Sequence, residues 1–197
     1  MSSWWYPIDV PLVLASRSPR RKAILELVRI PFEQIPSSIE EEHLSADPIE
    51  VVEHWAKMKA EDVSVDHPSS PVLGADTMVV LDNRLLGKPS SPREAVSMLK
   101  TLSGKWHRVF GGVALEWREK EISFSFFEST RVKFRNLTDP EIEAYVETGE
   151  SLDKAGAYGI QGFGSVLVEK VDGCYFNVMG LPIARFIETF RKKVEHG

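Results

Sequence analysis

A chain of 197 residues, 43% of them hydrophobic, is long enough to bury one sizeable core shared between two lobes. Its formal net charge of −5 argues against a general nucleic-acid-binding protein, because such proteins usually carry a basic surface. A single cysteine, Cys174, excludes an internal disulfide framework, and no run of about 20 apolar residues could span a membrane. We therefore expect a cytoplasmic protein with neither a nucleic-acid nor a membrane partner.

Strand and helix patterns alternate along residues 11–197, which we interpret as one domain behind an aromatic-rich extension at residues 1–10. In chain order, the sequence predicts strands at 12–15, 32–35, 72–81, 84–86, 106–117, 121–134 and 163–171, and helices at 19–28, 48–63, 92–102, 140–147 and 181–194. The two longest strands are joined by a short polar turn and suit an antiparallel pair. The mixture predicts an α/β domain with a mixed sheet.

The turn after the first expected strand is the first segment that suggests chemistry. Residues 16–21 read Ser-Arg-Ser-Pro-Arg-Arg, in which Ser18 suits a helix N-cap and Pro19 the first helical position. Three successive basic residues, Arg20 to Lys22, follow at the end where the helix dipole favours an anion. A bound phosphate would explain this charge, and a surface helix with a basic start is the alternative.

The second candidate is Asp76, which lies inside the most apolar expected strand. Burying a carboxylate there without a partner would cost several kcal/mol, so such a group usually pairs with a cation, holds a metal or acts as a base. Gly74 beside it would let a ligand approach the backbone closely. An aspartate that caps a turn at the end of the strand is the alternative.

Two short motifs are candidates to complete a phosphate site around Asp76. Gly87-Lys88-Pro89 places a lysine where it can reach back toward that strand, although this triplet is also an ordinary solvated turn. Glu40-Glu41-Glu42 is by itself typical of a solvated acidic face. However, Mg²⁺ bound to phosphates takes one or two protein carboxylates, so one of these glutamates together with Asp76 would meet that need.

A glycine-rich stretch at residues 149–162 contains four glycines, with Asp153, Lys154 and Gln161 among small residues. This composition predicts a loop that packs closely against a flat group or surface. It is not a P-loop, because the Gly-x-x-x-x-Gly-Lys-Ser/Thr order is absent. A plain connector between a helix and a strand is the alternative.

Two further polar residues have ordinary explanations. Lys59 lies near the end of the helix expected at 48–63, where a lysine is normally exposed to solvent. His107 has no second histidine or cysteine at metal-ligand spacing, so we expect it to have a structural role.

Taken together and in this order, the segments resemble the Maf family of nucleoside triphosphate pyrophosphatases. The matching segments are residues 14–21, 74–77, 87–89, 102–107, 153–162 and 177–182. The resemblance implies an elongated α/β fold, related to inosine triphosphate pyrophosphatases, in which two lobes enclose a substrate cleft over a long mixed sheet, often in a homodimer. It also implies hydrolysis of a nucleoside triphosphate to the monophosphate and pyrophosphate, with a divalent metal, Mg²⁺ or Mn²⁺.

The same resemblance assigns roles to individual residues. Asp76 matches the family's catalytic aspartate, which would orient or deprotonate the attacking water, and Glu41 with Asp76 would hold the metal. The positions implicated in substrate binding are Ser16, Arg20, Arg21, Glu41, Lys59, Thr77, Lys88 and Gln161.

The family divides by substrate, and Arg20, Thr77 and Gln161 match the branch that acts on dTTP and UTP. The branch that acts on 7-methyl-GTP tends to have Trp in place of Arg20 and Glu in place of Gln161. A glutamine amide offers one donor and one acceptor, which complement the O4 and N3–H edge of uracil or thymine. A 7-methyl-GTP or other purine triphosphate pyrophosphatase is the first alternative, and a nucleotide-sensing regulator of cell division is the second.

Overall fold

The computed structural model describes residues 6–40 and 47–196. The chain divides into two compact units. The first unit contains the residues up to Asp76, the segment Gly111–Glu128 and the residues from Gly180 onward, and the second unit contains Thr77–Phe110 and Ser129–Met179. The division is consistent with the two lobes that the resemblance implies.

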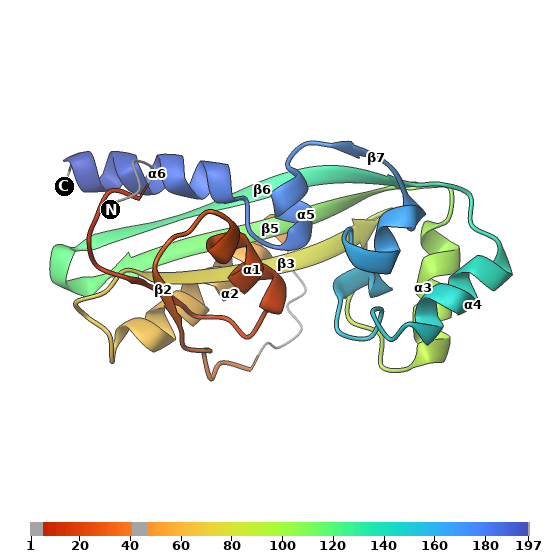
Figure 1. Ribbon diagram of the computed structural model, residues 1–197, viewed down its shortest axis with the longest axis horizontal. Helices are drawn as coiled ribbons and strands as arrows, with labels where there is room; N and C mark the ends of the chain where they lie inside the picture. Colours follow the sequence, from red (N-terminus) through yellow and green to blue (C-terminus); the bar gives the residue numbers. More distant parts are fainter. Residues whose placement is uncertain (1–5, 41–46, 197) are drawn as a thin grey trace. The chain divides into compact units, whose positions relative to one another are not determined.

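Within the described residues the strands form one mixed sheet in the order β2-β1-β3-β5-β6-β7, with β4 paired to β3 (Figure 1). β1 pairs in parallel with both β2 and β3, whereas β4 and β7 run antiparallel to β3 and β6. β5 and β6 are joined by a three-residue 3-10 helix, η1, and so short a connection joins antiparallel strands. The α/β fold with a mixed sheet is therefore confirmed. The strands span Leu12–Leu14 (β1), Phe32–Gln34 (β2), Val72–Leu81 (β3), Arg84–Leu86 (β4), Trp106–Trp117 (β5), Ile122–Phe134 (β6) and Val168–Asp172 (β7), and η1 spans Arg118–Lys120.

In the first unit, helix α2 (Pro48–Ser64) lies directly against β3 and β5. A Cβ atom on Gly74 would lie 2.1 Å from the Ala56 carbonyl oxygen, and one on Gly112 would lie 2.0 Å from the carbonyl oxygen of Val52. The two glycines therefore let the backbone of α2 touch the sheet. The expectation that Gly74 makes room for a ligand was wrong, because the helix fills that space.

The first unit also contains α1 (Pro19–Leu27) and the C-terminal helix α6 (Ile183–His196), which lies along β6 in Figure 1. Phe186 and Phe190 of α6 are fully buried, and their rings stack 5.8 Å apart. The ring of Tyr6 lies 6.0 Å from that of Phe190, and its hydroxyl donates to the Val10 carbonyl at 2.7 Å. Tyr6 of the aromatic-rich extension thus packs on the first unit, while residues 1–5 lie outside the described part of the chain.

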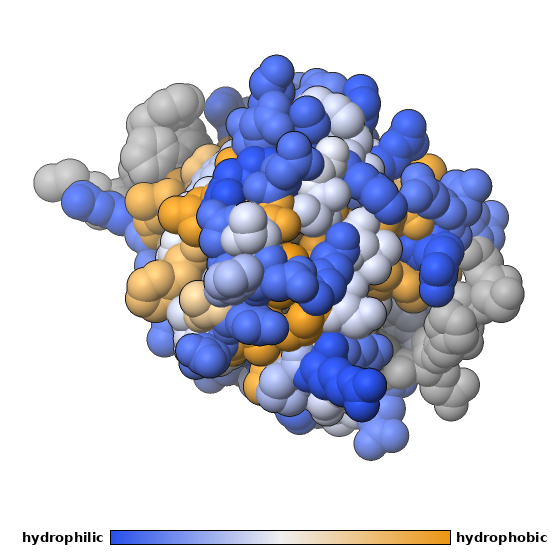
Figure 2. All heavy atoms as spheres, turned by 90° about the vertical axis from the view of Figure 1, so that its right-hand side faces the viewer, coloured by the Kyte–Doolittle hydropathy of each residue, from blue (hydrophilic) through white to orange (hydrophobic). Residues whose placement is uncertain are grey.

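The second unit is built around α3 (Pro92–Leu102) and α4 (Asp139–Glu147), whose buried side chains pack with Phe134 and Tyr158. The shorter helices of this unit are η2 (Ala155–Ala157), η3 (Gly162–Leu167) and α5 (Tyr175–Met179). Hydrophilic and hydrophobic side chains are interspersed over the face seen in Figure 2. Among the described residues, no helix is both long and apolar enough to cross a membrane.

Two expectations about the last quarter of the chain were wrong in part. Of the strand expected at 163–171, only the portion from Val168 onward is strand, since the residues before it belong to the 3-10 helix η3. The Glu150 carboxylate accepts the backbone N–H groups of Phe163 and Gly164, which diverts them from a sheet partner. Helix α5 was not expected, and α6 begins at Ile183, directly after Pro182.

Candidate functional site

The turn between β1 and α1 has the predicted cap. Ser18 is the N-cap, Pro19 is in the first turn, and the Ser18 side chain accepts the backbone N–H of Arg21 at 3.4 Å. The Oγ of Ser16 accepts two hydrogen bonds, from the Ser18 backbone N–H at 3.2 Å and from Nη1 of Arg21 at 2.9 Å. A hydroxyl whose acceptor positions are both used still has its own proton to donate. Ser16 is therefore arranged as a donor beside the start of the helix.

Arg21 holds this turn in place within the first unit. It is buried, and its Nε donates to the Gly180 carbonyl oxygen at 2.9 Å while its Nη1 bonds to Ser16. The guanidinium thus supplies a fixed positive charge close to the positive end of the α1 dipole. Arg20, the next residue toward the cap, is half-buried. Contact of either arginine with a substrate stays a prediction.

A buried ion pair joins the strand that carries Asp76 to helix α2. The Lys59 Nζ lies 2.8 Å from Oδ1 of Asp76, and both residues are almost fully buried, at 8% and 7% exposed. Residues 74 and 76 share one face of the strand. Because α2 packs closely against Gly74, it also places Lys59 over Asp76. Lys59 is therefore not the solvent-exposed lysine that its helical position alone suggested.

Asp76 lies on β3 and the α1 turn follows β1, and these neighbouring strands pair in parallel. Leu14 is paired with Leu73, and the N–H of Ala15 donates to the Leu73 carbonyl at 2.9 Å, after which the chain turns into α1. Ser16 and Asp76 therefore both follow the carboxyl end of the same parallel pairing. In α/β sheets this is the edge at which ligands bind.

Only one of the two expected metal ligands, Asp76, lies among the described residues. Glu41 lies outside the described residues. Among the residues that are described, no three His, Cys, Asp or Glu side chains gather as a potential metal cluster. Asp76 offers a carboxylate at this edge, which fits Mg²⁺, an ion that usually keeps several waters and binds one or two carboxylates plus phosphate oxygens.

The other three expected site residues belong to the second unit. Thr77 follows Asp76 on β3 and is half-buried, whereas Lys88 and Gln161 are exposed. The backbone N–H of Gly156 donates to the Gly87 carbonyl at 3.0 Å, so the turn that carries Lys88 is tied to the glycine-rich loop. The structure thus brings two predicted motifs of this unit together.

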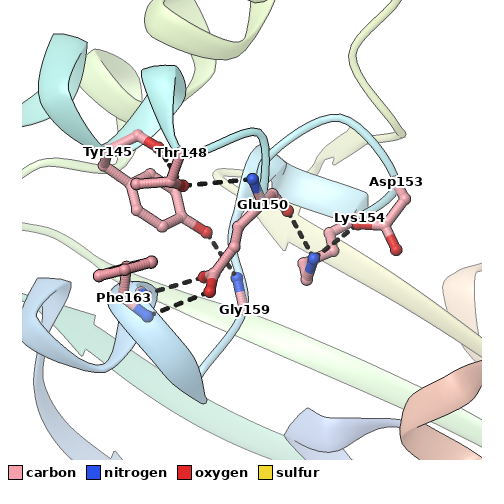
Figure 3. A network of polar contacts seen from close by, with 8 residues as sticks. Tyr145, Thr148, Glu150, Asp153, Lys154, Gly159 and Phe163 are labelled. Carbon is pink, nitrogen blue, oxygen red and sulfur yellow. Dashed lines mark hydrogen bonds and ion pairs between the residues drawn. The ribbon is translucent and has the colours of Figure 1, made fainter.

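The glycine-rich loop folds back on itself, as Figure 3 shows. A Cβ atom on Gly164 would lie 2.0 Å from the Gly159 carbonyl oxygen, so the two ends of the segment between them touch. The ammonium of Lys154 bonds to the Glu150 carbonyl and, at 2.6 Å, to the Asp153 carboxylate. Asp153 and Lys154 therefore pair with each other, and Lys154 also binds the backbone of the loop.

Sequence reasoning missed Tyr145 and Glu150, which organise this loop. The Tyr145 hydroxyl accepts the N–H of Gly159 at 3.1 Å, and the Glu150 carboxylate accepts those of Phe163 and Gly164 at 3.2 and 3.3 Å (Figure 3). A lone glutamate just after a helix and a tyrosine inside one carry no recognisable sequence signal. The spacing of the glycines was the only available indication that the loop is tightly folded.

His107 is buried in the second unit, at 3% exposed. Its Nε2 lies 2.7 Å from the Tyr158 hydroxyl, its ring packs edge-on against Phe134, and its Nδ1 finds no hydrogen-bond partner among the described residues. Burial lowers the pKa of His107 from 6.5 to about 4, so the ring is neutral at pH 7.

We expect the free energy of unfolding to fall by about 3 kcal/mol because of His107 as the pH drops from 6.5 to 4. In this window the unfolded chain binds a proton at the imidazole and the folded protein does not, so acidification favours unfolding. Urea denaturation at several pH values measures the effect. The pH dependence should be shallower in His107→Gln and unchanged in the control His54→Gln, whose parent side chain is exposed. Equal slopes in all three proteins would contradict the assignment.

Comparison with known proteins extends over most of the chain. The family model described as Maf-like protein matches residues 11–193. A dTTP/UTP pyrophosphatase of Bacillus mycoides (strain KBAB4) is 48% identical over 182 residues, which cover 92% of this chain and 94% of that protein. Proteins of the same name from Thermosipho africanus (strain TCF52B) and Carboxydothermus hydrogenoformans (strain ATCC BAA-161 / DSM 6008 / Z-2901) are 49% and 45% identical, covering 88% and 92% of this chain and 88% and 97% of their own.

Proposed function

Because this chain belongs to the Maf family, we propose that it hydrolyses dTTP and UTP to the nucleoside monophosphate and pyrophosphate. The observation that carries the proposal is the buried pair that Lys59 forms with Asp76 on β3, the parallel neighbour of the strand that leads into α1. A carboxylate for the water and a helix start with basic side chains for the phosphates are two of the parts that this reaction needs.

In the proposed reaction Asp76 orients or deprotonates the water that attacks the substrate. The Lys59 ammonium, 2.8 Å away, fixes one carboxylate oxygen and leaves the other to face the water. The Ser16 hydroxyl donates to a phosphate oxygen, since its acceptor positions are already occupied. Arg20, Arg21 and Lys88 supply positive charge to the triphosphate, and charge-assisted contacts of this kind are the strong ones.

We propose that Mg²⁺ or Mn²⁺ assists the reaction. Asp76 would hold the ion, together with Glu41 from outside the described residues. When bound, a divalent ion neutralises the charge that develops on the phosphate oxygens. From the family resemblance we also propose a cytoplasmic homodimer that does not bind nucleic acid. Sedimentation of the purified protein measures its oligomeric state.

Pyrophosphate release tests the proposed function over a panel of dTTP, UTP, CTP, ATP, GTP and 7-methyl-GTP, each with Mg²⁺, with Mn²⁺ and with EDTA. We expect the highest kcat/KM for dTTP and UTP, and loss of turnover when EDTA removes the metal. Preference for 7-methyl-GTP would assign the chain to the purine branch instead. Nucleotide binding without turnover would support a nucleotide sensor.

Gln161→Glu tests how the base is selected. An ionised glutamate only accepts hydrogen bonds, so it cannot donate to the O4 of uracil or thymine. We expect kcat/KM for UTP and dTTP to fall about a hundredfold and that for GTP to change less. Measuring kcat/KM for the three nucleotides in both proteins checks this. Equal losses on all three would contradict a base-reading role for Gln161.

A further inference from the structure

Gln161 projects from the tip of a closed loop. Gly159 and Gly164 touch at the base of the loop, where a Cβ atom on Gly164 would lie 2.0 Å from the Gly159 carbonyl oxygen. Between them Gly162 has a φ of +63°, a left-handed conformation that side chains rarely adopt. The loop is thus short and strongly constrained, and the Gln161 side chain is exposed at its far end.

The carboxylate of Glu150 fixes the backbone just after Gln161. Its Oε1 accepts the N–H of Phe163 at 3.2 Å and its Oε2 that of Gly164 at 3.3 Å, at the first turn of η3 (Figure 3). Hydrogen bonds to a charged acceptor are stronger than those between neutral groups. A Cβ atom on Gly162 would lie 2.3 Å from Oε1 of Glu150, so the same carboxylate also packs against the residue next to Gln161.

Tyr145 fixes the backbone just before Gln161. Its hydroxyl accepts the N–H of Gly159 at 3.1 Å (Figure 3), and the ring is buried in the core of the second unit. Tyr145 lies in the last turns of α4, and Glu150 follows three residues after the end of that helix. One end of one helix therefore fixes the loop on both sides of the glutamine.

Selectivity for uracil or thymine requires a glutamine whose amide is held. An amide that is free to flip offers its donor and acceptor in either order, so it also pairs with the cytosine edge. A properly held polar group discriminates strongly, and a loosely held one far less. We propose that Glu150 and Tyr145 are positioning residues for base selectivity, which act by fixing the loop backbone that presents Gln161 and so limit the orientations in which its amide meets the base. This inference rests on the proposed function of Gln161.

The test compares kcat/KM for UTP with that for CTP in variants of the purified full-length protein. Glu150→Gln keeps the shape of the side chain, but it replaces one of the two acceptor oxygens with an NH₂ group, which cannot accept the hydrogen bond of the backbone N–H that faces it. We expect the UTP/CTP ratio to fall about tenfold. Tyr145→Phe removes one neutral acceptor and should lower the ratio about threefold. The matched control Glu147→Gln makes the same charge change at an exposed position of α4 and should leave the ratio unchanged.

A base-free ligand separates this role from a loss of structure. Inorganic triphosphate, used as a competitive inhibitor, should keep its inhibition constant in all three variants, because it has no base to read. A UTP/CTP ratio that stays at the parent's value in both Glu150→Gln and Tyr145→Phe would overturn the inference. If Glu150→Gln does not fold, Tyr145→Phe decides the question alone.

A double-mutant cycle shows whether the effect passes through Gln161. In a Gln161→Ala background, Glu150→Gln should cause no further change in the UTP/CTP ratio. A further tenfold fall in that background would overturn the positioning role. A parent protein that turns over no nucleoside triphosphate would instead refute the proposed function, which distinguishes the two failures.

Discussion

Asp76→Asn is expected to lower kcat for dTTP and UTP by about a thousandfold, the size of a lost general base. The substitution keeps the shape of the side chain and an oxygen that still accepts the hydrogen bond of Lys59, so we expect the variant to remain folded. Its melting temperature should be lower, because the buried ammonium loses its counter-charge. Pyrophosphate release and a thermal melt followed by circular dichroism measure the two effects.

The matched control for this variant is Asp66→Asn, which removes a carboxylate from an exposed position of the same unit. It should leave both kcat and the melting temperature within error of the parent. If the Asp76→Asn protein turned over dTTP at the parent's rate, Asp76 would be only the structural partner of Lys59. A loss of activity that merely followed unfolding would lead to the same conclusion.

Local sequence patterns predicted the α1 turn correctly because the forces that shape it are local. Ser18 caps the helix within three residues, and Pro19 needs only its own fixed backbone angle. The helices at 48–64 and 92–102 were equally clear, since each opens with a capping side chain followed by proline. Such signals fix where elements begin, and therefore where their charged ends lie.

The partner of Asp76 was not predictable, because it depends on how a helix packs. Lys59 is far from Asp76 along the chain and meets it only because Gly74 lets α2 lie on the strand. The sequence correctly indicated that a buried carboxylate needs a partner, without showing which kind. The wrong expectation for Gly74 has the same origin, since a missing side chain accommodates a helix as readily as a ligand.

The end of the glycine-rich loop shows a different limit. Residues 163–167 have the apolar pattern of a strand, and tertiary hydrogen bonds from their backbone N–H groups to Glu150 impose a 3-10 helix instead. No rule of propensity includes an acceptor supplied by a residue thirteen positions away. The position of Gln161 is therefore a property of the folded unit, although its chemical type was evident from the sequence.

Gly74→Ala should lower the free energy of unfolding by about 3 kcal/mol, the upper range for overpacking. The added methyl group would lie 2.1 Å from the Ala56 carbonyl oxygen and 2.8 Å from the Ala60 nitrogen, and backbone atoms of a helix cannot move aside singly. For a chain of this length, the melting temperature should fall by about 6–12 °C. Gly87→Ala is the control, because a Cβ atom there has no neighbour within 4 Å, and its melting temperature should match the parent's.

The same substitution connects the packing of α2 to the proposed chemistry. If α2 is pushed off β3, Lys59 moves with it, and the 2.8 Å contact with Asp76 lengthens. Turnover of dTTP, measured at a temperature where the variant is still fully folded, should therefore fall even though no polar group has changed. A folded Gly74→Ala protein with the parent's kcat would mean that catalysis does not depend on the Lys59 contact. The role of Lys59 would then be limited to neutralising a buried charge.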